Sequence, residues 1–165
     1  MSWNCKLLDV VGTRLVRFEP KPGDPRCGET RLLTADGQEH SYSDLPAGSM
    51  FYVPENPIVE NDDPVSAHWP WYLASPERLS DFYRQRNSHR RPLLVVLPGK
   101  DLFLVDGKCW NEKGMYGGWE VTGEAPLITV SPSINIVGFY HGWLRNGIIS
   151  DDCEGRKFTA DGFRA

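Results

Sequence analysis

Short apolar runs separated by polar turns dominate the chain. Residues 30–34 and 38–42 flank Ala35-Asp36-Gly37, and Asp-Gly is a strong signal for a tight turn between two strands. The run Pro92–Leu97 is continuously apolar and is followed by Pro98-Gly99, which is typical of a strand buried on both faces. The pattern therefore predicts short strands rather than long helices.

The second half of the chain continues this pattern. Residues 102–105 run into Asp106-Gly107, which predicts a second tight turn with residues 108–110 returning from it. Residues 127–137 and 139–152 are the last two extended segments. We expect these segments to pair in an antiparallel sheet.

One segment has the pattern of a helix. Ser75 can cap it, Pro76 suits the first helical position, and Leu79, Phe82 and Tyr83 recur at helical spacing up to about Arg86. The sequence thus predicts a mainly β (α+β) protein: one compact antiparallel β domain spanning residues 1–165, with one helix packed on the sheet.

The composition is that of a protein with many turns, and it argues against membrane-spanning, secreted and nucleic-acid-binding proteins. The 165 residues include 16 Gly and 13 Pro, more than an ordinary protein carries. No apolar run approaches the roughly 18 residues that span a bilayer, and the first residues lack a signal-peptide pattern. A net charge of -4 makes nucleic acid an unlikely partner. The four scattered cysteines form no C-x-x-C pair, which favours a reduced, cytoplasmic protein, although two disulfides remain conceivable.

The most informative turn is Asn146-Gly147, the preferred pair for a two-residue type I′ hairpin. In that hairpin Arg145 pairs with Ile148, and the same register places His141 opposite Asp152. Opposed side chains on an antiparallel pair share a face. A carboxylate bonded to one imidazole nitrogen raises the basicity of the other. We therefore expect Asp152 to orient His141.

A nucleophile is available on the preceding segment. Ser131 and Ser133 project to one face if that strand is regular, and a short connection through Gly138 would make it the neighbour of the strand that carries His141. Pro132, which lacks an N–H, favours an edge position for the strand. Three consecutive segments would then supply serine, histidine and aspartate. Cross-strand His–Asp pairs are also common as simple surface contacts.

The C-terminal part resembles a known family. It shows Thr129-Val130-Ser131-Pro132-Ser133-Ile134, then Tyr140-His141, the Asn146-Gly147 turn, and Asp152-Cys153. These motifs are similar to those of a family of small bacteriophage and bacterial proteins that phage genomes often mislabel "ammonia monooxygenase". The resemblance is clear over about residues 119–153 and weaker back to residue 45. The chain departs from many members at Glu154-Gly155-Arg156, where they often have Thr-His.

The resemblance implies a serine hydrolase. Members of that family also occur beside bacterial ubiquitin-like conjugation genes, where a serine-protease role has been proposed. The resemblance implies that Ser133 or Ser131 is the nucleophile, that His141 is the base and that Asp152 orients it. The bond attacked would be a peptide, isopeptide or ester bond. The expected partner is a protein or peptide, such as a ubiquitin-like conjugate or a host defence factor, in the cytoplasm of a host cell.

Other residues complete the expected site. Acyl transfer needs donors for an oxyanion, and the backbone of Gly138 or Gly142 could supply them. An aromatic group could bind substrate or partner: Trp69, Trp71, Tyr72 and Trp143. No cofactor is required by this chemistry, and no metal site is expected because no two candidate ligands have a recognised spacing.

Three alternatives remain at this stage. The protein could be a noncatalytic module that binds and inhibits a host protein, or a virion accessory protein. Cys153 could also act as the nucleophile with His141, although a buried, small apolar role is favoured for it.

Overall fold

The structure is a computed structural model. It describes residues 1–165 apart from 18, 20, 24–27, 55–92, 106–107 and 111–115. The chain divides into two compact units, one of residues 1–8, 45–51 and 92–165, the other of residues 9–44 and 52–91. The expectation of one domain stays a prediction. The described part is mostly β-structure, as predicted.

The second unit contains a three-stranded antiparallel sheet of β3 (Val10–Arg17), β4 (Gly28–Thr34) and β5 (Glu39–Ser41). The β4–β5 connection is the predicted Asp-Gly turn. Gly37 has a φ of 83°, and the N–H of Thr34 donates to the carbonyl of Gln38 at 3.0 Å. The polar residues between the two apolar runs thus form the tight turn that the sequence indicates.

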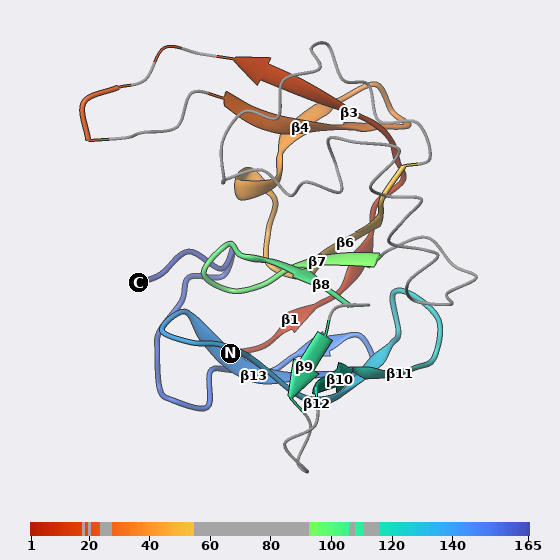
Figure 1. The fold of residues 1–165 in the computed structure, drawn as a ribbon, viewed down its shortest axis with the longest axis vertical. Coiled ribbons are helices and arrows are strands. Elements are labelled where there is room, and N and C mark those ends of the chain that lie inside the picture. The colour runs from red at the N-terminus through yellow and green to blue at the C-terminus, as the bar shows by residue number, and fades with distance from the viewer. Residues whose placement is uncertain (18, 20, 24–27, 55–92, 106–107, 111–115) are drawn as a thin grey trace. The chain divides into compact units, whose positions relative to one another are not determined.

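The first unit contains a five-stranded sheet, which Figure 1 shows with β12 and β13 side by side. Its strands, in spatial order, are β1 (Trp3–Asn4), β14 (Ile148–Ile149), β13 (Tyr140–Arg145), β12 (Thr129–Ile136) and β11 (Glu120–Thr122). All four pairings are antiparallel. The two predicted extended segments therefore pair with each other, as expected.

A second sheet of the same unit consists, in spatial order, of β2 (Lys6–Leu7), β6 (Ser49–Tyr52), β7 (Leu93–Val96) and β8 (Leu102–Leu104). Every residue from Leu93 to Leu97 is fully buried, which confirms the predicted buried strand. The pairing of β2 with β6 is parallel, so this sheet is mixed and departs from the antiparallel pairing that the sequence predicts. A parallel pair forms here because residues 9–44 separate the two strands along the chain and leave room for a crossover.

The expected return of residues 108–110 against 102–105 is not observed. Strand β9 (Lys108–Trp110) pairs instead with β10 (Tyr116–Gly118), in a separate two-stranded sheet. The Asp106-Gly107 turn itself lies outside the described residues.

The predicted helix over residues 75–86 also lies outside the described residues. In the part that the structure describes, the helical structure is a single 3-10 turn, Tyr42–Asp44. Within the same part of the chain, no helix is both long and apolar enough to cross a membrane.

The core beneath the five-stranded sheet is centred on aromatic side chains. Tyr140 is fully buried, and its ring lies edge-on to Phe158 with the centroids 6.4 Å apart. Phe158 makes a second edge-on contact with Trp3 at 6.0 Å. These contacts attach the C-terminal segment and β1 to β13, so that the sheet and the end of the chain share one apolar layer.

The Asn146-Gly147 hairpin has the predicted geometry. Asn146 and Gly147 have φ values of 46° and 70°, and Arg145 pairs with Ile148. Positive φ at both central positions is the requirement of a type I′ turn.

A substitution at Gly147 tests how much this turn contributes to the stability of the fold. A Cβ at Gly147 would lie 2.6 Å from the carbonyl oxygen of Pro126, whereas a Cβ at Gly138, where φ is 82°, meets nothing within 4 Å. We expect Gly147→Ala to lower the free energy of unfolding by about 1–3 kcal/mol more than Gly138→Ala, because it adds a clash to the strain of a positive φ. Urea unfolding of the two variants measures the difference. Equal losses would show that the contact with Pro126 relaxes freely.

Candidate active site

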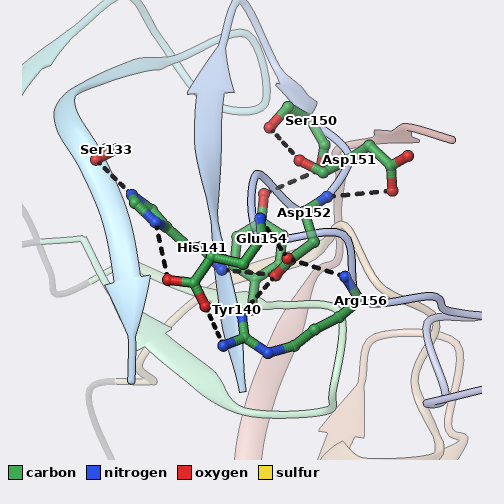
Figure 2. Close-up of polar contacts among 8 residues, drawn as sticks. All are labelled: Ser133, Tyr140, His141, Ser150, Asp151, Asp152, Glu154 and Arg156. Atoms are coloured by element: carbon green, nitrogen blue, oxygen red, sulfur yellow. Dashed lines mark hydrogen bonds and ion pairs between the residues drawn. The ribbon is translucent and has the colours of Figure 1, made fainter. Parts of the chain in front are cut away.

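Strands β12 and β13 bring a serine and a histidine together. The Oγ of Ser133 lies 3.2 Å from Nε2 of His141 (Figure 2). The residue paired with His141 is Asn135. The pairing shifts by two residues between Val130 and Ile134, so three residues of β12 oppose one residue of β13. Continued without a shift, the pairing of Val130 with Leu144 would set Ser133 opposite His141. The bulge instead makes Asn135 the partner of His141 and leaves Ser133 among the extra residues, with its hydroxyl still at the ring.

Ser131 belongs to the same bulge but contacts a different strand. It pairs with Glu120 of β11 and is exposed. The expectation that Ser131 and Ser133 occupy equivalent positions of a regular strand is therefore wrong. The edge position predicted from Pro132 is also wrong, since β12 lies between β11 and β13; the bulge is what accommodates the proline. Only Ser133 of the two serines is placed at His141.

The chain leaves the sheet ladder soon after the Asn146-Gly147 turn. The N–H of Ser150 still donates to the carbonyl of Trp143, but the N–H of Trp143 donates to the Oγ of Ser150 instead of its carbonyl. One step further, the N–H of His141 donates to Oδ2 of Asp152 at 2.9 Å. Two side chains thus replace the backbone acceptors of a missing strand.

This replacement corrects the predicted role of Asp152. Asp152 does lie against His141, but its carboxylate accepts from the histidine's backbone N–H rather than from the ring. The same carboxylate accepts from the N–H groups of Glu154 at 2.8 Å and Arg156 at 3.2 Å, and from Nη1 of Arg156 at 3.0 Å. Its side chain has no exposed surface. Burial alone would raise the pKa of Asp152, but these hydrogen bonds to the ionised form outweigh it and lower the pKa.

Glu154 occupies the position at the ring that Asp152 was expected to fill. Its Oε1 lies 3.4 Å from Nδ1 of His141, and its Oε2 is bonded to Nη2 of Arg156 (Figure 2). An ionised carboxylate can only accept, so the proton of the neutral ring belongs on Nδ1. Nε2 is then free to accept the hydroxyl proton of Ser133. The described contacts therefore run from Ser133 through His141 to Glu154.

The sequence contains a signal for this arrangement that strand register alone misses. Asp152-Cys153-Glu154-Gly155 has aspartate first and glycine fourth, the preferred residues of a four-residue turn in which the aspartate bonds to its own following backbone. The N–H of Gly155 donates to the carbonyl of Asp152, and Gly155 has a φ of 82°. An aspartate whose carboxylate bonds to its own following backbone does not orient an imidazole ring. The same turn directs the next acidic residue, Glu154, toward His141.

The two oxyanion candidates have different surroundings. Gly142 is buried, and a Cβ there would lie 2.1 Å from the hydroxyl of Tyr140, so packing requires this glycine. Burial raises the pKa of Tyr140 to about 12, and its hydroxyl donates to the carbonyl of Ser150 at 3.0 Å. Gly138 is exposed in the turn between β12 and β13. The oxyanion role of either glycine stays a prediction.

The remaining expected site residues have other surroundings or lie outside the described residues. Trp143 is half-buried, with the guanidinium of Arg145 4.3 Å from its ring centre. Trp69, Trp71 and Tyr72 lie outside the described residues. Cys153 is a free thiol and is exposed, so the expectation that it is buried is wrong; its N–H, not its side chain, contacts the carbonyl of His141. In the described part of the chain no group of three or more His, Cys, Asp or Glu side chains could hold a metal ion.

Comparisons with known proteins add no relative. No protein-family model matches the chain. No curated protein and no solved structure gives a significant match either.

The buried carboxylate predicts a pH dependence of stability. Because folding lowers the pKa of Asp152 below its ordinary value of 3.8, its stabilising effect is present above that value and is lost as the pH falls through the lower, folded-state pKa. We expect Asp152→Asn to cost about 3 kcal/mol at neutral pH, because an amide cannot accept all four donors, and to flatten the acid limb of the stability curve. Urea unfolding across that pH range measures both effects.

Asp151→Asn is the matched control. Its carboxylate is 47% exposed and forms an ion pair with the N-terminal amine at 3.1 Å, so its loss should change stability little. Equal losses in the two variants would contradict the special role of Asp152.

Proposed function

We propose that this protein is a serine hydrolase that acts by acyl transfer. The observation that carries the proposal is the contact of 3.2 Å between Oγ of Ser133 and Nε2 of His141, with Glu154 on the opposite ring nitrogen. Ser133 is the nucleophile, His141 is the general base, and Glu154 orients the ring. This order of contacts is that of a Ser-His-acid triad, in which the acid bonds to the nitrogen remote from the serine.

The reaction would proceed in two steps. Ser133 attacks a carbonyl carbon while Nε2 of His141 takes the hydroxyl proton, and that proton then passes to the leaving amine or alcohol as the bond to it breaks. Water attacks the resulting ester on Ser133 with the same base assistance, which releases the acid and restores the serine. Glu154 stabilises the imidazolium that forms in each step.

The exposure of these groups supports an accessible site. The side chain of His141 is 27% exposed and that of Glu154 46% exposed, while Ser133 is half-buried. A substrate carbonyl can therefore approach from solvent without opening of the core. The pairing described for β11 ends at Ser131, two residues before Ser133, so β11 does not cover the serine through strand pairing.

The resemblance of the C-terminal motifs to the phage and bacterial family supports the same nucleophile and base. In this chain Glu154 takes the role that the resemblance implies for Asp152. The substrate class that fits is a peptide, isopeptide or ester bond of a protein or peptide, such as a ubiquitin-like conjugate or a host defence factor, in a host cytoplasm. This mechanism uses no cofactor.

A second candidate function is noncatalytic binding of a host protein. It is favoured by the turn between β12 and β13, where Val137 is 83% exposed and Phe139 53% exposed. Exposed apolar side chains on one turn are typical of a protein contact. Under this alternative His141 and Ser133 form an ordinary polar contact beside the binding turn.

Labelling with a fluorophosphonate probe separates the two candidates and identifies the nucleophile. We expect the wild type and Ser131→Ala to be labelled, and Ser133→Ala to lose labelling, because Ser133 rather than Ser131 contacts the base. His141→Ala should label about 10²–10⁴-fold more slowly, since it removes the group that takes the proton. Mass spectrometry of the labelled peptide locates the modified hydroxyl.

Circular dichroism and thermal unfolding of each variant provide the control for folding. A folded wild type that takes up no probe would argue for the binding function. Label on Ser131 would overturn the assignment of the nucleophile while leaving a hydrolase in place.

A further inference from the structure

Arg156 connects the two carboxylates that surround His141. Its Nη1 is 3.0 Å from Oδ2 of Asp152, and its Nη2 bonds to Oε2 of Glu154 (Figure 2). The two terminal nitrogens of one planar guanidinium thus hold two different acids. The side chain of Arg156 is only 17% exposed, so it is largely enclosed by these contacts.

The two acids differ in how firmly the fold holds them. The side chain of Asp152 is completely buried and accepts backbone hydrogen bonds from three residues, so the fold holds its carboxylate in one position. Glu154 is 46% exposed, and of its two oxygens one faces His141 and the other faces Arg156. A half-exposed glutamate with several rotatable bonds would otherwise sample many rotamers in water.

The geometry points to Arg156 as a positioning residue for the proposed hydrolase. We propose that Arg156, anchored by Asp152, holds Glu154 against Nδ1 of His141, and that this contact keeps the ring proton on Nδ1. Nε2 then stays available for the hydroxyl proton of Ser133. The inference rests on the proposed function, since it concerns how that base is prepared.

Arg156 could act on His141 through its charge or through the position that it gives to Glu154. The carboxylate of Glu154 lies on the ring, the carboxylate of Asp152 lies on its backbone N–H, and the guanidinium of Arg156 lies behind both. If Arg156 acted only through its charge, its removal would leave Glu154 on Nδ1 and the tautomer unchanged. If it acts by position, its removal releases Glu154 and the proton is no longer held on Nδ1.

The test is the tautomer of neutral His141, measured by ¹⁵N NMR of the ring in the resting protein. We expect the Nδ1–H form in the wild type and a shift toward the Nε2–H form in Arg156→Gln. Glu154→Ala should give the same shift, and the double variant Glu154→Ala/Arg156→Gln should add nothing, because both changes break one chain of contacts. Arg164→Gln removes an exposed arginine of the same C-terminal segment and should leave the tautomer as in the wild type.

Arg156→Lys keeps the test usable if Arg156→Gln does not fold. An ammonium on a flexible stem can remain on buried Asp152 but lacks the fork that reaches a second carboxylate, so the same tautomer shift is expected with less loss of stability. A folded Arg156→Gln or Arg156→Lys protein with the wild-type tautomer would overturn the inference. So would a further shift in the double variant.

Fluorophosphonate labelling distinguishes this inference from the proposed function. Arg156→Gln should label about 10- to 100-fold more slowly than Arg164→Gln, as expected for a base whose orientation is lost. If the tautomer responds but no variant is labelled, the positioning of His141 by Arg156 stands and the hydrolase proposal falls. If labelling requires Ser133 and His141 but neither the tautomer nor the rate depends on Arg156, the hydrolase stands and this inference falls.

Discussion

The arrangement around His141 depends on one buried carboxylate. Asp152 accepts hydrogen bonds from the backbone of β13, from two N–H groups of the turn that follows it, and from the guanidinium of Arg156. An ionised carboxylate has acceptor sites for all four, and each bond favours its charged form, which is why its pKa is lowered despite burial. Without those donors a charge in that position would be strongly unfavourable.

The same interaction determines where the chain goes after β14. If β14 continued along β13, its backbone carbonyls would accept from the N–H groups of Trp143 and His141. Instead the side chains of Ser150 and Asp152 take that role, which frees the backbone to turn at Gly155. The turn brings Glu154 to the ring of His141 and Arg156 back to Asp152. The carboxylate of Asp152 thus supports both the fold of this segment and the proposed site, although its hydrogen bond to His141 is to the backbone and not to the imidazole ring.

The other half of the site comes from an irregularity in β12. A strand paired without interruption would keep one register along its length, but the bulge between Val130 and Ile134 changes the partner of every residue beyond it. Ser133 is one of the residues of this bulge, and its hydroxyl contacts the ring of His141, whereas Ser131 pairs with Glu120 of β11. Two serines only two positions apart thus have different neighbours, and Ser133 is the one that lies at the histidine.

The sequence by itself determined the elements governed by local chemistry. Positive φ at Asn146 and Gly147, the turn at Gly37 and the burial of Leu93–Leu97 each follow from residue types a few positions apart. The Asn146-Gly147 turn identified His141 as a candidate, because a two-residue turn defines the register of its hairpin. Ser131 and Ser133 were both candidates on the preceding segment, and the sequence left the choice between them open. Only the tertiary structure decided that Asp152 bonds to backbone, that Glu154 faces the ring and that β2 pairs in parallel with β6. The turn pattern of Asp152-Cys153-Glu154-Gly155 favours bonds from Asp152 to its own following backbone, but only the assembled sheet brings the unpaired N–H and the ring of His141 to that turn. These outcomes therefore depend on which donors remain unpaired once distant strands have come together.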